Sequence, residues 1–394
     1  MIFLNNSYTI QDVFHRFYPQ YESSHCVSAD QRKAAFHIMN CKTGAFGVNL
    51  SVCQECGTIS VHYNSCRDRC CPMCQEFPKE KWVDARREDL LDAPYFHVVF
   101  TVPQELNPVI YSNQKLLYTA LYQASSETLK ELAADNRYLG ASIGSVCILH
   151  TWGSSMNFHP HIHAIVLGGG LDAKDHWKDN GRDFFLPVMV LSRKFRGKYM
   201  SKLKESWKDK KLKFYGSAQV YNNYYAMKKL INDCYQKEWI CYCKKPFQGA
   251  ESVIRYLGKY THRIAVSNHR IKKVTDTGVT FSVKDYKDHG SWKNITIPGK
   301  EFIRRFLMHV PPKRFVRIRH YGLLSSRKKK EKITLCRNIL GCKRYLSKLK
   351  DMDATEMIWH LYKKNINKCT CCGGKIIALT KEWYSSKEHF YMRC

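Results

Sequence analysis

The sequence predicts an α+β protein with a cysteine-rich module, a core of strands and helices, and a basic C-terminal region. Short apolar segments predict strands at 95–102, 144–152 and 162–167. The stretches 108–135 and about 192–213 have apolar residues at helical spacing. Eight of the eighteen cysteines lie between Cys26 and Cys74. We therefore expect three domains, at residues 1–92, 93–310 and 311–394.

The composition indicates a globular protein that binds a polyanion. Hydrophobic residues make up 44% of the chain, while 64 Lys and Arg against 34 Asp and Glu give a formal charge of +30. Such an excess opposes compaction unless it is neutralised, and nucleic acid is the usual partner. No apolar run reaches the roughly 20 residues that span a bilayer, and residues 1–21 lack a signal-peptide core. We expect a cytoplasmic protein that binds DNA or RNA and no membrane.

The clustered cysteines indicate zinc and not disulfides, because they come in paired spacing on a long, basic chain without a signal peptide. Two Cys-x-x-Cys pairs are separated by 14 intervening residues and predict one structural four-thiolate site, formed by Cys53, Cys56, Cys71 and Cys74. A second site could use Cys41, Cys66 and Cys70 with nearby histidines, the alternative being buried free thiols. Arg67 and Arg69 stand between these ligands and are candidate DNA contacts.

A further half-site lies near the C-terminus. Cys369-x-x-Cys372 has knuckle spacing but lacks an obvious second pair, unless Cys394, His389 or Cys336 completes it. The segment 313–322 interleaves basic and apolar residues, a pattern suited to phosphate contacts and base stacking. Arg317 and Arg319 are therefore candidate DNA-binding residues.

The segment His-Pro-His-Ile-His at 159–163 precedes an apolar run that three glycines at 168–170 are expected to end. In a strand, His161 and His163 share one face and could hold one divalent cation. Their neighbours Ile162, Ala164 and Val166 would face a core. Two histidines on a solvated strand face are the alternative. His97, on the strand at 95–102, is interpreted as structural.

A second motif runs from Glu251 to Arg263. Its apolar and aromatic residues have helical spacing, which places Tyr256 and Tyr260 one turn apart on one face. Packing in a core is the alternative role for these tyrosines. Gly258 weighs against packing alone, since glycine inside a helix costs about 1 kcal/mol relative to alanine.

Together these motifs resemble the two-tyrosine HUH endonucleases, and among them the rolling-circle transposases of the insertion sequence ninety-one family. The residues that carry the resemblance are His-Pro-His-Ile-His, Arg-Tyr-Leu-Gly-Lys-Tyr-Thr-His-Arg at 255–263, and the cysteine segment 64–74. Cys70 stands where the family usually has histidine, which leaves the pairing of zinc ligands open. The resemblance spans most of the chain. It implies an HUH nuclease core with a central antiparallel sheet flanked by helices.

The resemblance also implies the chemistry. Tyr256 or Tyr260 would attack single-stranded DNA at a transposon end, leaving a 5′-phosphotyrosine and a free 3′-hydroxyl. Mg²⁺ or Mn²⁺ would bind His161 and His163, with His159 or else Glu251 as third ligand. Lys259 and Arg263 would contact the DNA, and Lys259 or Arg255 could stabilise the leaving oxygen. The partners are DNA ends and target, with no small-molecule substrate, in a bacterial nucleoid.

Three other functions remain open from the sequence. An HUH replication initiator or relaxase of a plasmid would share the chemistry but not the zinc module. A non-catalytic, zinc-containing DNA-binding regulator would use the histidines and tyrosines only for packing. An RNA-binding protein would explain the charge and the cysteines, but it offers no role for the paired tyrosines.

Overall fold

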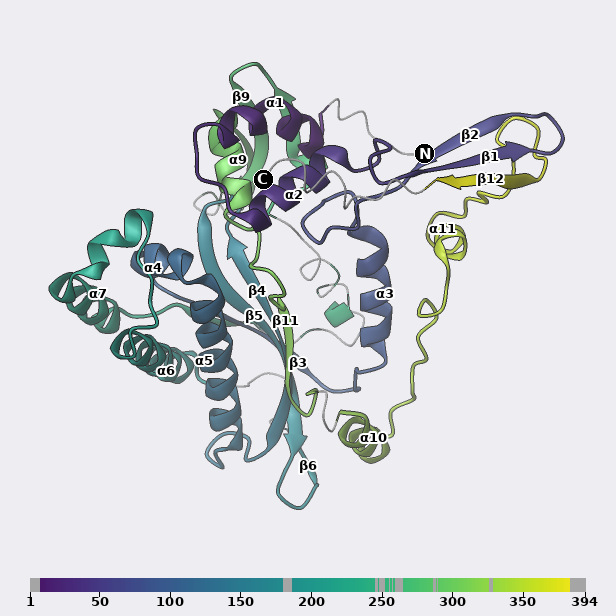
Figure 1. Cartoon of the computed structure of the whole chain (residues 1–394). Helices are drawn as coiled ribbons and strands as arrows, with labels where there is room; N and C mark the ends of the chain where they lie inside the picture. The colour runs from purple at the N-terminus through teal and green to yellow at the C-terminus, as the bar shows by residue number, and fades with distance from the viewer. Residues whose placement is uncertain are drawn as a thin grey trace. The chain divides into compact units, whose positions relative to one another are not determined.

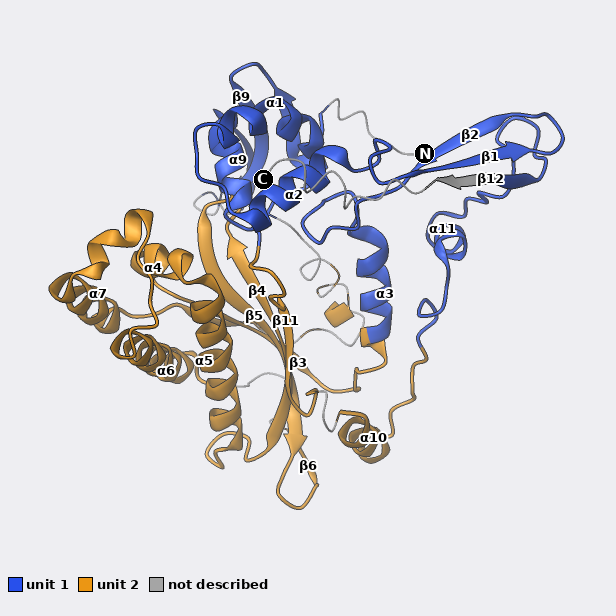
Figure 2. Ribbon diagram, viewed as in Figure 1, with its two compact units in different colours: residues 1–85, 262–310, 347–394 blue, residues 86–261, 311–346 orange. Residues whose placement is uncertain are grey.

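The structure is a computed structural model of the 394-residue chain (Figure 1). It describes residues 8–179, 186–244, 247, 252–254, 256, 258, 265–285, 288, 290–325 and 329–382. The chain forms two compact units, each built from separate stretches (Figure 2). Unit 1 comprises residues 1–85, 262–310 and 347–394, and unit 2 comprises 86–261 and 311–346. The predicted α+β class is confirmed, but the units do not coincide with the three consecutive domains that we expected.

The difference arises because the N-terminal helices of unit 1 pack on a segment far along the chain. Helices α1 (Ile10–Glu22) and α2 (Ala29–Asn40) each begin with a capping box. The ring of Phe14 in α1 meets that of Phe306 in α9 (Gly299–Leu307), with centroids 5.1 Å apart. Ahead of α9 lies an antiparallel sheet of β8 (Ile271–Val274), β9 (Gly278–Asp285) and β10 (Ser291–Pro298). Residues 265–310 therefore belong with the N-terminus.

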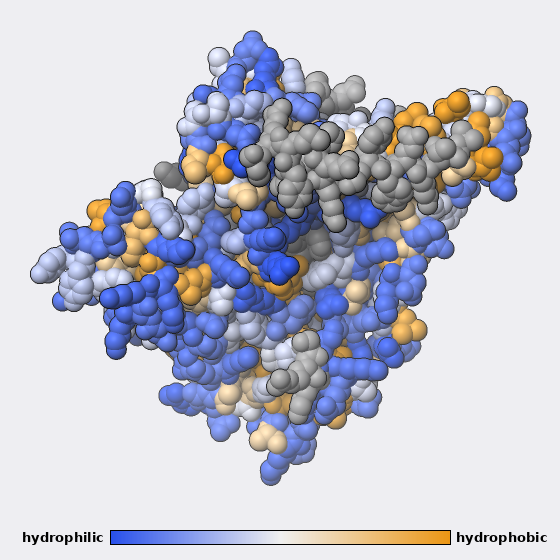
Figure 3. All heavy atoms as spheres, viewed as in Figure 1, coloured by the Kyte–Doolittle hydropathy of each residue, from blue (hydrophilic) through white to orange (hydrophobic). Residues whose placement is uncertain are grey.

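A second sheet of unit 1 joins the two ends of the chain. Its order is β12-β1-β2, from strands β1 (Val48–Cys53), β2 (Ile59–Tyr63) and β12 (Ile376–Glu382), all antiparallel. Apolar side chains on β2 are exposed, with Ile59 63% accessible. Figure 3 shows hydrophobic residues on this part of the surface. Helix α11 (Ala354–Tyr362) belongs to the same unit, and α3 (Glu76–Arg87) crosses the boundary between the units.

Unit 2 is built on a six-stranded sheet. The order is β11-β4-β5-β3-β7, with β6 pairing β5, and all pairs are antiparallel, as expected. The strands are β3 (Tyr95–Thr101), β4 (Ser142–Trp152), β5 (Phe158–Leu171), β6 (Trp177–Asp179), β7 (Cys241–Lys244) and β11 (Ile318–Gly322).

The three glycines at 168–170 do not end the central strand, contrary to our expectation, because β5 continues to Leu171. A Cβ atom at Gly168 would meet the Phe96 ring, one at Gly169 would meet the Trp177 ring, and one at Gly170 would meet the backbone of Ser142. The glycines therefore allow close approach by the neighbouring strands and side chains, where the sequence suggested a strand terminus.

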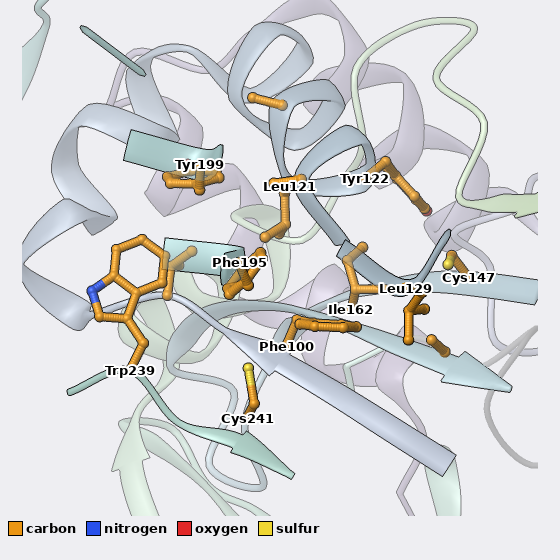
Figure 4. Close-up of a cluster of buried hydrophobic side chains, with 14 of the residues drawn as sticks. Phe100, Leu121, Tyr122, Leu129, Cys147, Ile162, Phe195, Tyr199, Trp239 and Cys241 are labelled. Carbon is orange, nitrogen blue, oxygen red and sulfur yellow. The ribbon is translucent and has the colours of Figure 1, made fainter. Parts of the chain in front are cut away.

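Helices cover one face of the unit 2 sheet and bury the main core there. They are α4 (Asn107–Ser112), α5 (Gln114–Ala134), α6 (Val188–Lys208) and α7 (Tyr224–Gln236). Figure 4 shows Phe100 and Ile162 of the strands among Leu121 of α5 and Phe195 of α6. Ile162, Ala164 and Val166 all lie in this core, as predicted. The alternation of the strand directs the side chains of His161 and His163 to the other face of the sheet.

Helix α10 (Lys329–Leu340) completes unit 2. None of the helices that the structure describes is both long enough and apolar enough to cross a membrane.

Candidate active site and cysteine clusters

Three histidines meet on the face of the unit 2 sheet opposite the core. The antiparallel register places His150 of β4 directly across from His161 of β5. Ring nitrogens of His150, His161 and His163 all lie within 4.8 Å of one another. The two closest are Nε2 of His161 and Nε2 of His163, 3.0 Å apart. Nδ1 of His161 donates a hydrogen bond to the carbonyl of His159 (2.6 Å), which leaves a lone pair on its Nε2.

These histidines fit a divalent cation. Burial lowers the pKa of His161 and of His163 well below the usual value, so both rings are neutral near pH 7 and can act as ligands. Two ligands about 2.1 Å from an octahedral ion and at right angles to each other lie about 3.0 Å apart. This is the separation of the two Nε2 atoms. Imidazole ligands suit Mn²⁺ better than Mg²⁺.

The third member of this cluster is His150, where the sequence suggested His159 or Glu251. The ring of His159 lies 5.0 Å from that of His161 between centroids, and among the described residues His159 does not join the group. Directly paired residues on neighbouring strands are closer than residues two apart on one strand, at about 5 Å against about 6.6 Å. The strand predicted at 144–152 contained the signal, since a hairpin would bring His150 beside His161. Glu251 lies outside the described residues.

Tyr256 reaches the histidine cluster from a helical segment. Residues 252–254, 256 and 258 are helical. The Tyr256 hydroxyl lies 2.7 Å from Nε2 of His97 and 3.0 Å from Nδ1 of His163. The ring of Phe247 packs edge-on against the Tyr256 ring, with centroids 5.3 Å apart. Tyr260, Lys259, Arg255 and Arg263 lie outside the described residues.

His97 is a site residue that the sequence reasoning treated as structural. It lies on β3, next to β5, and its Nε2 is 2.9 Å from Nδ1 of His163. Burial, together with the positive charge of Lys244 on β7, lowers the pKa of His97 to about 4. A neutral imidazole can accept a hydrogen bond from a phenol. His97 and Thr101 lie on the same face of β3, and Thr101 pairs with His161 on β5. The alternation of side chains along β3 was therefore the signal in the sequence that could have placed His97 on the histidine face of the sheet.

The cysteines form two groups of four, in a pairing that differs from our expectation. One group is Cys41, Cys66, Cys71 and Cys74, and the other is Cys53, Cys56, Cys369 and Cys372. The expected four-thiolate site joining Cys53 and Cys56 to Cys71 and Cys74 is therefore wrong. The reason is non-local, because pairing of β1 with β12 puts Cys53 opposite Ile376.

The first group fits a structural zinc ion. The sulfur of Cys74 lies 3.5 Å from that of Cys41 and 3.6 Å from that of Cys66. Sulfurs bound about 2.3 Å from a tetrahedral zinc lie about 3.8 Å apart. Cys70 is buried but belongs to neither group within the described residues. Cys336 is buried on α10, also outside both groups, and Cys394 and His389 lie outside the described residues.

The predicted DNA-binding arginines have different surroundings. Arg67 is exposed, and Arg69 is half-buried; both stand between Cys66 and Cys71 in the sequence. The guanidinium of Arg319 stacks over the rings of Tyr122 and Phe315, 4.3 and 5.1 Å from their centroids. Arg317 is half-buried, and its carbonyl accepts hydrogen bonds from the Tyr122 hydroxyl and from the Leu149 N–H. Packing thus accounts for part of the role of Arg319.

A basic cavity of about 580 Å³ lies around β11 in unit 2. Among the described residues its lining holds the aromatic ring of Phe315, no carboxylate and five cationic residues, which are Arg86, Lys115, Arg314, Arg319 and Lys329. A concave, positively charged surface with an aromatic side chain suits a nucleic-acid backbone and its bases.

Comparison with known proteins defines the class of protein. Residues 144–332 match the family model described as putative transposase, and residues 13–102 match the transposase zinc-binding domain. The chain is 41% identical over 334 residues to the putative transposase y4qJ of Sinorhizobium fredii, covering 84% of both chains. It is 27% identical over 297 residues to the transposase for insertion sequence element IS801 of Pseudomonas savastanoi pv. phaseolicola, covering 74% of this chain and 69% of the relative.

The chain therefore belongs to the transposases of the insertion sequence ninety-one family. The resemblance drawn from the motifs is confirmed at this level. No solved structure matches the chain significantly.

Proposed function

We propose that this transposase cleaves and rejoins single-stranded DNA through a covalent bond between a tyrosine and a 5′ phosphate, in rolling-circle transposition. The observation that carries the proposal is the position of the Tyr256 hydroxyl, within 3.0 Å of both His97 and the candidate metal ligand His163. A tyrosine that served only for packing would need a single hydrogen-bond partner for its hydroxyl, whereas the Tyr256 hydroxyl contacts two histidines, one of them a candidate metal ligand.

The hydrogen bonds around Tyr256 provide a path for its proton. A phenol has a pKa near 10, so it is a weak nucleophile at neutral pH unless a base accepts its proton. With Nε2 of His163 reserved for a cation, the proton of His163 lies on Nδ1 and is donated to the tyrosine oxygen. Tyr256 in turn donates its own proton to Nε2 of His97, 2.7 Å away. His97 thus orients the hydroxyl and acts as the base.

The cleavage step exchanges one phosphate ester for another. The Tyr256 oxygen attacks phosphorus, the bond from phosphorus to the 3′ oxygen breaks, and that oxygen leaves with a proton as a 3′-hydroxyl. A divalent cation held by His150, His161 and His163 would neutralise the non-bridging oxygens and orient the phosphate. The phosphotyrosine conserves the energy of the broken bond, so rejoining needs no ATP.

Two further features support DNA as the substrate. The net charge of +30 and the basic cavity around β11 supply the counter-charge that a polyanion requires. Lys244, at the end of β7, lies close enough to His97 and His163 to lower the pKa of both. Its ammonium group is a candidate contact for the scissile phosphate. Tyr260 is proposed as the second nucleophile, which would allow one strand transfer while the first bond persists.

The test uses purified protein and labelled single-stranded DNA carrying the end of the element, with Mn²⁺ or EDTA. We expect DNA that migrates with protein on a denaturing gel, only with Mn²⁺. The Tyr256→Phe, Tyr260→Phe double variant should form no adduct. Tyr225→Phe, which alters a highly exposed tyrosine on α7, is the control and should react normally. Normal nicking by the double variant would refute the tyrosine mechanism, and tight binding without any adduct would favour a non-catalytic DNA-binding regulator.

A further inference from the structure

The cysteine group at the edge of the small sheet in unit 1 combines residues from both ends of the chain. Cys53 is the last residue of β1 and Cys56 follows the strand, whereas Cys369 and Cys372 precede β12, more than 300 residues later. The zinc-binding domain model ends at residue 102 and the transposase model ends at residue 332. Cys369 and Cys372 therefore lie outside both matched segments. We propose that these four cysteines bind a second structural zinc ion, which fastens the C-terminal segment to the N-terminal part of unit 1.

The sulfur positions fit tetrahedral zinc. Sγ of Cys53 lies 3.4 Å from Sγ of Cys372, and Sγ of Cys56 lies 3.7 Å from Sγ of Cys369. All four sulfurs lie within 4.8 Å of one another. Four thiolates at about 2.3 Å from one zinc ion would be about 3.8 Å apart. Four soft thiolates at this spacing form a closed, structural site with no open position for substrate.

The two halves of the site have the same internal hydrogen bonds. In the first, the Gly57 N–H donates to the Cys53 carbonyl (3.1 Å), and the Cys53 N–H donates to the Thr58 carbonyl (3.0 Å). In the second, Gly373 donates to Cys369 (3.0 Å) and Cys369 donates to Gly374 (2.8 Å). Gly57 and Gly373 each follow the second cysteine and have positive φ, +70° and +79°. Two segments far apart in sequence therefore adopt one ligand-presenting turn.

Backbone N–H groups also point at the sulfurs of the C-terminal half. The N–H of Cys371 donates to Sγ of Cys369 and that of Gly374 donates to Sγ of Cys372, both at 3.4 Å. On the other half, the Thr58 hydroxyl lies 3.1 Å from Sγ of Cys56. Such donors stabilise the negative charge of metal-bound thiolates.

Where the burial of its residues is described, the sheet that carries the site has little hydrophobic core of its own. Ile59, Val61 and Tyr63 of β2 are exposed, and this surface appears in Figure 3. Small domains that cannot bury enough apolar surface are commonly held by a metal ion.

The C-terminal segment is also attached to the N-terminal part of unit 1 at a second place, earlier in that segment. Oδ2 of the buried Asp84 accepts hydrogen bonds from Ser347 and from the N–H groups of Lys348 and Leu349.

Zinc content of the purified full-length chain tests the proposal without any measurement of DNA cleavage. We expect two zinc ions per chain by elemental mass spectrometry, and one in the Cys369→Ser, Cys372→Ser double variant. Cys371→Ser is the matched control, because Cys371 lies between the two ligands, is exposed and belongs to neither group. It should retain two zinc ions. Two zinc ions in the double variant, or one in the wild type, would overturn the proposal.

A labelling experiment on the wild type covers the case in which the double variant does not fold. Cys371 and Cys372 are adjacent and both exposed, so in the absence of metal a small maleimide should reach both. With zinc bound, we expect fast modification of Cys371 and protection of Cys372, read by peptide mass spectrometry. A chelator should then release Cys53, Cys56, Cys369 and Cys372 together. Equal modification of Cys371 and Cys372 in the zinc-loaded protein would contradict the site.

Discussion

The hydroxyl of Tyr256 lies 2.7 Å from Nε2 of His97, a histidine 159 residues earlier in the chain. The two rings are close, with centroids 4.6 Å apart. His97 is buried on β3, where the positive charge of Lys244 also disfavours its protonated form. A buried, neutral imidazole beside a tyrosine hydroxyl gives that hydroxyl a fixed orientation and an acceptor for its proton.

Replacement of His97 should therefore slow DNA cleavage more than it alters DNA binding. We expect His97→Ala to lower the single-turnover rate of adduct formation by about 100-fold or more, the usual contribution of a general base. The affinity for uncleaved DNA should change little. His176→Ala, at an exposed histidine after β5, is the control and should react at the wild-type rate. An unchanged rate in His97→Ala would remove His97 from the mechanism.

The three proposed metal ligands predict which histidine substitutions raise the Mn²⁺ concentration that cleavage requires. His150→Ala and His161→Ala should each raise the Mn²⁺ concentration needed for half-maximal adduct formation by at least about tenfold. His159→Ala should have a smaller effect, because its side chain does not join the group of three. Manganese binding followed by electron paramagnetic resonance gives a readout without DNA. If His159→Ala and His150→Ala raised the required Mn²⁺ concentration equally, His150, His161 and His163 would not be the three metal ligands.

The basic cavity around β11 predicts a salt-dependent contact with DNA. Lys115 is exposed and lines this cavity. Lys115→Ala should weaken binding to single-stranded DNA of any sequence, and it should reduce the slope of log affinity against log salt by about 0.7. Lys174→Ala removes an exposed lysine between β5 and β6 and should leave the slope unchanged. If both variants change the slope equally, binding reflects overall charge and not the cavity.

His320 should make stability depend on pH in mildly acidic solution. Burial lowers its pKa to about 4, with further lowering by Arg86 and Lys329 and an opposing effect of Asp89. The unfolded chain, with a histidine pKa near 6.5, binds more protons between these values. The free energy of unfolding therefore falls as pH decreases from about 6.5 to about 4, by up to about 1.4 kcal/mol per pH unit for this group.

Denaturant unfolding of the wild type and of His320→Asn across this range measures the effect. The unfolding free energy of the wild type, minus that of the variant, should decrease as the pH falls, since only the wild type loses the contribution of a neutral His320. A constant difference from pH 7 to pH 4 would mean that His320 titrates alike in the folded and unfolded chains.

The core between the sheet and α6 should be sensitive to truncation. Phe195 is fully buried and packs against Phe100 and Trp239, with ring centroids 4.9 and 5.4 Å apart. Phe195→Ala should lower the free energy of unfolding by about 3–5 kcal/mol, from lost burial and the cavity that remains. Met189→Ala lies on the same helix at a 50% exposed position and should change it by about 0.5 kcal/mol or less. If both variants lowered the free energy of unfolding by similar amounts, the face of α6 that carries Phe195 would not be the one that packs in the core.

Much of the local arrangement was predictable because it depends on short-range rules. The alternation of side chains along a strand separated His161 and His163 from Ile162 and Ala164, and the core confirms this division. The paired cysteines indicated zinc, and the matched zinc-binding domain agrees. The motifs at 159–163 and 255–263, taken together with the cysteine segment 64–74, indicated the family, since each is a contiguous run of residues.

The partners of these residues were decided only by the tertiary structure. His150 and His97 join the site because β4 and β3 pair with β5 in a particular register. Cys53 and Cys56 meet Cys369 and Cys372 because β12 pairs with β1. Strand pairing is set by hydrogen bonds and burial between segments far apart in the chain. The sequence by itself determined which residue types carry the chemistry, and the folded sheet decided which of them meet.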